Sequence, residues 1–334
     1  MKGRSWQLLI GLGVGVGLLL FAMRGVDLAA LKDALVHANY WLLAPIIGLT
    51  LLAFYVRAVR WGLLLRTVKS AIPASNLFSA TMIGFAANNL LPARLGEFIR
   101  AWAIGRSERI SRSAAFATVV VERIVDVFAL LFFFCLALLL HPFTESVRRA
   151  GWMLLGVNAI LLFVLVLAER HPERVSAASG WALGHLPGKI GRRVHVLLDN
   201  FVVGLGVLRQ GPAIGGVIAY SLLMYGLTLV SIQAALMAFS FHVPWYASIV
   251  LLVSTSLGII VAPTPGYVGA MQVACVWGLS LFGVDKSRAF SFSLYYHVSQ
   301  FLPITVLGLW YLARQGLSLS DVAGAAGKEA SEAA

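Results

Sequence analysis

Apolar residues dominate the chain in long runs that polar residues interrupt only briefly. A membrane-spanning helix needs about 20 predominantly apolar residues, because the hydrocarbon layer is about 30 Å thick and each helical residue rises 1.5 Å. We expect six runs to form transmembrane helices: 6–23, 39–59, 113–140, 151–168, 213–240 and 289–313. The pattern therefore predicts an all-α polytopic membrane protein, with one transmembrane domain over residues 1–317.

Two further apolar runs, 76–105 and 245–283, are broken near their middle by proline and glycine. Proline lacks a backbone donor and disfavours helix in the residue before it. Each arm has roughly 10–18 residues, which is short for a span. We expect both runs to be re-entrant helical hairpins, because irregular backbone at membrane depth needs protein or water around it. The alternative is a pair of kinked ordinary spans.

Three segments have patterns of a different kind. Apolar positions recur at helical spacing among the basic residues of 190–210, which predicts an amphipathic cytoplasmic helix. Residues 318–334 are small and polar and are expected to be a disordered cytoplasmic tail. The first run follows Lys2 and Arg4, as in a signal sequence, but we expect it to remain as an uncleaved helix. Its alternate glycines permit close helix packing, which leaves a homodimer possible.

The distribution of basic residues predicts the orientation of the chain. If each hairpin returns to its own side, most Lys and Arg residues lie on the side of both termini, which is then cytoplasmic. The opposite side carries only Arg24, Lys32, Arg148, Arg149, Lys286 and Arg288. With this orientation, segments 39–140 and 213–313 repeat the order span, hairpin, span in opposite membrane sense. Such an inverted repeat is typical of secondary transporters.

Composition supports a membrane protein and excludes several other classes. Hydrophobic residues make up 60% of the 334 residues and charged residues 12%, against about 25% charged in a typical soluble domain. The formal net charge is +12, which we attribute to topology and anionic lipids, since no nucleic-acid motif is present. The two cysteines and seven histidines have no ligand-like spacing. We therefore expect no metal, no cofactor, no catalytic residues and no nucleic-acid partner.

Span 113–140 contains three ionisable residues, Glu122, Arg123 and Asp126. Each costs about 2.5–3.5 kcal/mol at the centre of a membrane helix, so these residues must face protein or water. Glu122 and Asp126 share a helix face, and Arg123 can neutralise either of them. The three residues form either a headgroup or proton site, or a structural ion cluster that fastens this span to the first hairpin.

The break of the first hairpin also carries polar residues: Asn88, Asn89, Arg94, Glu97 and Arg100. Arginines can form charge-assisted hydrogen bonds to a phosphate, and the N-terminus of the following helix favours an anion. We expect Arg94 and Arg100 to bind a phosphate, although both could instead be cytoplasmic anchors. Glu97 could be a helix cap, paired with Arg100 or Arg123.

The second hairpin and the span after it offer a second polar group. Free backbone groups at the break can line a cavity, to which side chains of the neighbouring helices are expected to contribute. The candidate residues are Pro263, Pro265, Gly266, Gly269, Gln272 and His297. A lone histidine of this kind is more often a hydrogen-bonded helix contact than a proton carrier. Arg57, Arg60 and Trp61, at the end of the second span, are interpreted as an interfacial anchor.

Four segments resemble the lysylphosphatidylglycerol synthase transmembrane-region family, also called flippase-like. They are RAVRW at 57–61, NNLLPARLGE at 88–97, ERIVD at 122–126 and PTPGYVG at 263–269. The family includes the N-terminal domain of the multiple peptide resistance factor, and the resemblance covers about residues 5–314. Relatives often have Glu at the position of Gln272 and Arg at that of His297. We expect no aminoacyl-transferase domain like that of the factor, so the resemblance implies lipid handling without lipid aminoacylation.

These observations lead to one functional hypothesis and two rivals. We expect a translocase of the bacterial inner membrane that moves a phospholipid or a polyprenyl-phosphate-type lipid with an anionic headgroup between leaflets. The first rival is a non-transporting partner or regulator of an envelope-synthesis enzyme. The second is an intramembrane transferase, for which no acidic metal motif or nucleophile is present in the sequence.

Overall fold

The computed structural model describes residues 2–91, 95–145, 147–149, 211–262 and 264–319, with single positions in 152–170 and 321–324. Every regular element in this part of the chain is a helix. The expected span 151–168 is only partly described, and the amphipathic helix 190–210 and most of the tail lie outside the described residues. The helices are α1 (Lys2–Met23), α2 (Leu28–Val36), α3 (Leu43–Leu65), α4 (Ala74–Leu90), α5 (Gly96–Glu108), α6 (Arg112–Leu140), α10 (Gly211–Ala238), α11 (Ala247–Val261), α12 (Ala270–Ser280) and α13 (Lys286–Arg314).

Three of the described helices are long and apolar enough to cross a membrane: Tyr40–Leu65, which adds a short 3-10 turn to α3, then α6, and Ile214–Ala238 of α10. Helices α1 and α2 could form a fourth span, but the chain bends by 92° between them. Helix α13 has 29 residues and a more polar composition. The described part of the chain thus has three or four candidate spans. The six transmembrane helices expected from the sequence stay a prediction.

Both proline-interrupted runs form helical hairpins. Helices α4 and α5 are antiparallel, because Asn88 contacts Gly96 at one end while Asn76 contacts Glu108 at the other. The chain leaves α4 through Leu91, which is extended (φ −106°, ψ 147°), as expected for a residue before proline. Helices α11 and α12 pair in the same way, with Gly258 beside Ala274 and Gly278 beside Ser254.

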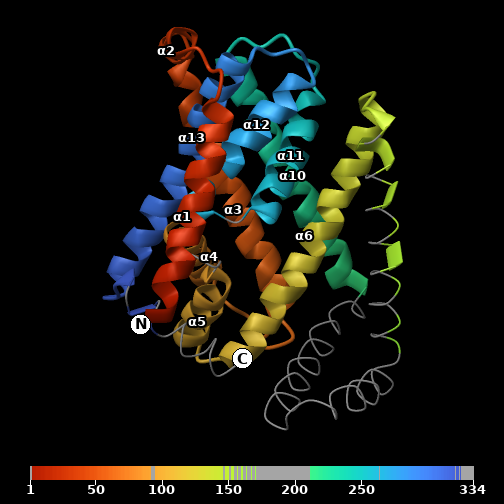
Figure 1. Ribbon diagram of the computed structural model, residues 1–334. Coiled ribbons are helices and arrows are strands. Elements are labelled where there is room, and N and C mark those ends of the chain that lie inside the picture. Colours follow the sequence, from red (N-terminus) through yellow and green to blue (C-terminus); the bar gives the residue numbers. More distant parts are fainter. Residues whose placement is uncertain are drawn as a thin grey trace, which may run out of the picture.

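The two hairpins enter the bundle from opposite ends (Figure 1). Helices α4 and α5 occupy the lower half of the view and α11 and α12 the upper half, while α3, α6 and α13 run along most of its height. The tips of the hairpins meet: a β-carbon on Gly266 would lie 3.3 Å from the carbonyl oxygen of Asn89. In the described part of the second break, Thr264 and Gly266 are buried, whereas Val261 and Val268 are exposed.

Helix α1 packs on the tip of the second hairpin through its glycines. Gly269 adopts φ +82°, and a β-carbon there would collide with the carbonyl oxygen of Gly15 and lie 2.8 Å from Cβ of Leu18. A β-carbon on Gly11 would lie 3.2 Å from Cδ of Pro265. One face of the glycine-rich helix is thus used within the chain, and a homodimer through this helix stays an untested alternative.

The open end of the first hairpin is fastened by a buried carboxylate. Glu108, the last residue of α5, accepts hydrogen bonds from Lys69 Nζ (2.6 Å) and Asn76 Nδ2 (2.6 Å). Lys69 lies in the connection between α3 and α4, and Asn76 lies in the first turn of α4. Glu108 therefore ties the end of α5 to the segment that leads into the hairpin.

Candidate functional site

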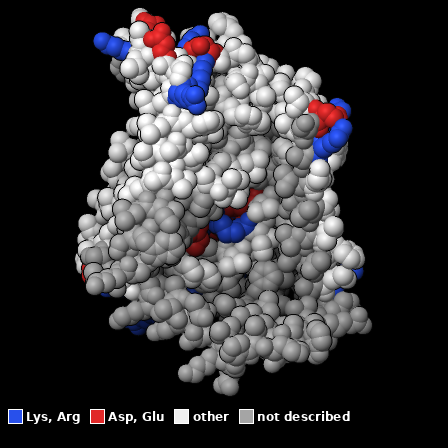
Figure 2. Space-filling view, in the orientation of Figure 1, with Lys and Arg blue, Asp and Glu red and all other residues white. Residues whose placement is uncertain are grey.

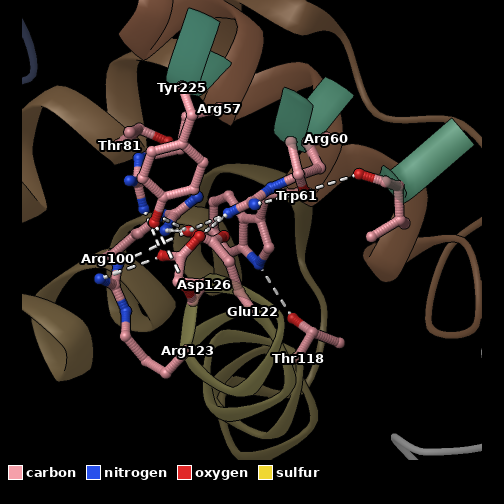
Figure 3. Close-up of polar contacts among 12 residues, drawn as sticks. Arg57, Arg60, Trp61, Thr81, Arg100, Thr118, Glu122, Arg123, Asp126 and Tyr225 are labelled. Atoms are coloured by element: carbon pink, nitrogen blue, oxygen red, sulfur yellow. Dashed lines mark hydrogen bonds and ion pairs between the residues drawn. The ribbon is translucent and has the colours of Figure 1, made fainter. Parts of the chain in front are cut away.

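Six ionisable side chains from three helices converge inside the bundle (Figure 3). We call them the charge cluster, and they are Arg57 and Arg60 of α3, Arg100 of α5, and Glu122, Arg123 and Asp126 of α6. The two α3 arginines are three residues apart and the two α6 carboxylates four apart, so each pair shares one helix face. The first hairpin contributes Arg100 to the same point.

Glu122 is the centre of the charge cluster. Its Oε1 atom accepts hydrogen bonds from Arg100 (3.0 Å) and Arg57 (3.2 Å) and forms longer ion pairs with Arg60 and Arg123, each at 3.5 Å. Its Oε2 atom is buried and has no hydrogen-bond partner. Because the side chain is fully buried, the arginines supply the compensation that an ionised carboxylate needs away from water.

Asp126 holds three of the same arginines. Its carboxylate lies 2.6 Å from Arg60 Nη2, 2.8 Å from Arg57 Nη1 and 3.5 Å from Arg123 Nη1. Helix α10 closes this side, since Arg60 Nη1 donates to Ser221 Oγ (2.8 Å) and the Tyr225 hydroxyl donates to the Asp126 carbonyl oxygen (3.3 Å). The charge cluster therefore links α3, α5, α6 and α10.

Aromatic rings support the guanidiniums. Arg100 Cζ lies 3.9 Å from the ring centroid of Trp61, whose Nε1 donates to Thr118 Oγ1 (3.0 Å). Arg57 and Arg123 lie over the ring of Phe85 at 5.3 and 5.6 Å. Cations over aromatic faces gain about 0.5–2 kcal/mol. These rings hold the arginines in place with no further charge.

Exposure increases from one side of the charge cluster to the other. Arg60, Arg100 and Glu122 are buried, whereas 12% of the Asp126 side chain, 14% of Arg57 and 37% of Arg123 are exposed. Figure 2 shows basic and acidic surface at the floor of a hollow, about midway along the face in view and apart from the charged groups at its upper end and right edge. The charges are thus reachable from one side and sealed on the other.

The charge cluster contradicts the interpretation of Arg57, Arg60 and Trp61 as an interfacial anchor. Helix α3 continues to Leu65, so these residues lie one to two turns before its end. Arg60 and Trp61 have no exposed surface. A signal was present in the sequence: two carboxylates inside a span require more than one cation, and two arginines on one helix face could supply it.

The remaining first-hairpin candidates have separate positions. Asn88 Oδ1 accepts the Gly96 amide (2.8 Å) and so satisfies a free donor at the start of α5. Asn89 Nδ2 donates to Thr305 Oγ1 (2.8 Å) on α13. Glu97 lies in the first turn of α5, and the described residues include no ion pair between it and Arg100 or Arg123. Arg94 lies outside the described residues.

The second-hairpin candidates form a neutral hydrogen-bond chain. The Gly269 amide donates to Gln272 Oε1 (2.7 Å), which leaves the Gln272 amino group to donate to His297 Nδ1 (2.9 Å). His297 Nε2 must then carry the proton and donate to the Gly266 carbonyl oxygen (2.8 Å). Pro265 opens the turn beside Gly266, and Pro263 lies outside the described residues. Among the described residues, no hydrogen bond or ion pair joins these hydrogen-bonded residues to the charge cluster.

The described residues include no group of three or more His, Cys, Asp or Glu side chains placed to hold a metal ion. The charge cluster is instead rich in donors: four guanidiniums and two carboxylates give a formal charge of +2. Buried atoms without hydrogen-bond partners include Nε of Arg60, Arg100 and Arg123 and Nη2 of Arg100. An arrangement of this kind can bind an anion.

Known sequences resemble this chain along most of its length. A UPF0104 membrane protein of Methanothermobacter thermautotrophicus is 25% identical over 310 residues, which cover 87% of this chain and 90% of that protein. UPF0104 membrane proteins of Methanocaldococcus jannaschii and Pyrococcus horikoshii are 21% and 22% identical, over 87% and 90% of this chain and 89% and 94% of theirs. No solved structure has significant similarity to it. The model of the lysylphosphatidylglycerol synthase TM region matches residues 8–308, and the chain belongs to that family.

Proposed function

We propose that this protein is a lipid translocase that carries a lipid with an anionic, phosphate-bearing headgroup between leaflets. The observation that carries the proposal is the charge cluster: six ionisable side chains inside an apolar bundle, of which Arg57 and Arg123 are partly exposed on one side. Ionised side chains at membrane depth are costly and usually mark a substrate or ion pathway. The headgroup binds the arginines while its acyl chains remain in the bilayer.

The proposed mechanism is alternating access between two inverted halves. The first half is α3, the α4–α5 hairpin and α6, and the second is α10, the α11–α12 hairpin and α13. In support, the corresponding helices α3 and α10 pack on each other. The contact of α4 with α13 also has a counterpart in the contact of α11 with α6, in which each helix is replaced by the corresponding helix of the other half. Rocking of the halves about the meeting hairpin tips would expose the arginines to one leaflet and then to the other.

The roles within the site follow from burial. Arg57 and Arg123 contact the headgroup, because they are the exposed cations. Arg100 joins them from the buried side. Glu122 and Asp126 hold the arginines apart and in place. Asn88, Asn89, Gln272, His297 and the hairpin glycines shape the two tips, and Arg94 and Glu97 complete the headgroup site from the first hairpin.

We propose a cytoplasmic membrane with both termini on the cytoplasmic side, and transport without catalysis. The relatives described above are archaeal, so the proposal is not restricted to a bacterial inner membrane. The family's description refers to a synthase, and the purified chain is expected to form no new lipid product.

A scrambling assay tests the proposal. The full chain is reconstituted into vesicles with a fluorescent phospholipid, and a membrane-impermeant quencher reports how much of it reaches the outer leaflet. Arg123→Gln and Glu122→Gln should lower the rate at least tenfold, whereas Arg106→Gln should not, because Arg106 is an exposed arginine of α5 outside the charge cluster. Equal rates in all variants, or no transport by the native chain, would contradict the proposal, and the second result would favour a non-transporting partner.

A further inference from the structure

The charge cluster has an unbalanced charge. Four guanidiniums meet two carboxylates, so the ion-paired side chains carry a formal charge of +2. Arg60, Arg100 and Glu122 have almost no exposed surface, so water does little to screen this surplus. A buried charge is tolerated when it is paired and hydrogen-bonded. The surplus therefore favours an anion beside the buried arginines.

The unpaired atoms specify the chemistry of the missing partner. Arg100 is 1% exposed, and its Nε and Nη2 atoms have no hydrogen-bond acceptor. Nε of Arg123 is also buried without a partner. Guanidinium groups only donate hydrogen bonds, so the partner must present several acceptor oxygens. A terminal phosphate offers three such oxygens and a charge of about −1.5 to −2 at neutral pH.

Arg123 gives an incoming anion a route to these donors. It is the most exposed member of the charge cluster, and its contacts to Glu122 and Asp126, both 3.5 Å, are among the longest. The Arg100 contact to Glu122 is shorter, at 3.0 Å. Arg123 can therefore turn towards a phosphate while Arg57, Arg60 and Arg100 continue to compensate the carboxylates.

We infer that the charge cluster recognises a phosphomonoester dianion in preference to a phosphodiester, whose phosphate carries a single charge. That the phosphate belongs to a lipid rests on the proposed function. The group that the charge cluster recognises is the terminal phosphate. Lipids with this group include phosphatidic acid and polyprenyl phosphates, and inorganic phosphate shares its chemistry. Phosphatidylglycerol with the same acyl chains is the matched diester.

Competition binding tests the preference. The purified full chain in detergent is mixed with equimolar phosphatidic acid and phosphatidylglycerol, and native mass spectrometry measures the ratio of the bound lipids. At pH 8 the ratio should exceed about ten, since hydrogen bonds to charged groups are stronger than neutral ones by about enough to change affinity tenfold. Equal binding, or a preference for phosphatidylglycerol, would overturn the inference.

Acidification tests the charge, because the second phosphate pKa is near 6 and the diester stays singly charged. The ratio should fall towards one at pH 5. The titratable and charged groups that face the phosphate are Arg57 and Arg60 of α3, Arg100 of α5, Glu122, Arg123 and Asp126 of α6, and Tyr225 of α10. Any titration of these groups acts on both lipids, so the ratio reports the phosphate. A ratio independent of pH would contradict dianion recognition.

Matched variants connect the preference to the cluster. Arg123→Gln lowers the formal charge of the cluster to +1 and should reduce the ratio of bound phosphatidic acid to bound phosphatidylglycerol severalfold. Arg106→Gln, on the exposed side of α5, should leave this ratio unchanged. An unchanged ratio in Arg123→Gln would overturn the inference.

The outcomes separate this inference from the translocase proposal. Selective retention of phosphatidic acid without scrambling supports the inference and contradicts transport. Equal scrambling of both lipids by the native chain supports transport and contradicts the inference. Stabilisation by inorganic phosphate, with no retained phosphatidic acid, supports dianion recognition and contradicts a lipid substrate.

Discussion

Arg60 Nη2 lies 2.6 Å from Asp126 Oδ1, and this buried ion pair joins α3 to α6. The same guanidinium donates to Ser221 on α10, so one side chain connects three helices. Arg60 is fully buried and Asp126 nearly so. The pair therefore has a structural role in addition to its place in the charge cluster.

Removing one partner of this pair should destabilise the protein, because its shortest buried ion pair is lost. The loss should stay below the roughly 3–5 kcal/mol of an isolated buried pair, since Arg57 and Arg123 still compensate Asp126 and Glu122 still compensates Arg60. Arg60→Met and Asp126→Asn should each lower the melting temperature of the detergent-solubilised protein. The double variant Arg60→Met with Asp126→Leu should recover part of the loss, since it removes both charges and leaves the net charge of the cluster unchanged. Additive losses would show that the two side chains do not act as a pair.

Gly269→Ala should separate α1 from the second hairpin. The new β-carbon would meet Gly15 and Leu18 of α1, and the residue would also have to keep a positive φ. Gly283→Ala is the matched control, because Gly283 has φ +71° with no atom within 4 Å of a β-carbon. The loss of thermal stability in Gly269→Ala should therefore exceed that in Gly283→Ala. Equal losses would indicate that backbone strain alone matters.

His297 is expected to remain neutral because its hydrogen-bond partners fix its protonation. Gln272 donates to Nδ1, and a proton on that atom would face another donor. Gln272→Glu removes this donor, so it should allow a charged histidine and make stability depend on pH near neutrality more than it does in the native protein. The measurement is the melting temperature between pH 5 and 8, and identical profiles would contradict the assigned tautomer.

Glu108 should make the stability of the first hairpin sensitive to acid. Burial alone would raise the pKa of Glu108, but hydrogen bonds from Lys69 and Asn76 and the charge of Lys69 hold it below its ordinary value. A depressed carboxyl pKa stabilises the fold above the unfolded value, about 4.3, and this contribution disappears as the pH falls through the folded value. Glu108→Gln should flatten the acid limb of a melting-temperature profile. Glu145→Gln, at an exposed glutamate, is the control.

The sequence was sufficient to predict both hairpins, because proline acts locally. Leu91 and Ala262, the residues before Pro92 and Pro263, both leave the helical region. The charged residues of α6 were also found, since an ionised side chain within an apolar run is conspicuous. Their partners on α3 were missed, because the apolar run seemed to end near Arg57 whereas the helix continues to Leu65.

Contacts between distant segments account for the rest of what the sequence did not reveal. Gly11 and Gly15 suggest helix packing by their spacing, yet nothing in that spacing identifies Pro265 and Val268 as their neighbours. The hydrogen bond between Gln272 and His297 likewise joins residues 25 positions apart. Such pairings depend on the tertiary arrangement of the helices, which hydropathy does not encode.

Glu122 offers its four cations a single atom, Oε1, while Oε2 stays without a partner. This redundancy means that no one guanidinium is indispensable to the carboxylate. When one arginine leaves, three remain on the same oxygen and no bare negative charge is created. One arginine can thus move from Glu122 to a bound anion, and return when the anion dissociates, without a large change in the stability of the protein.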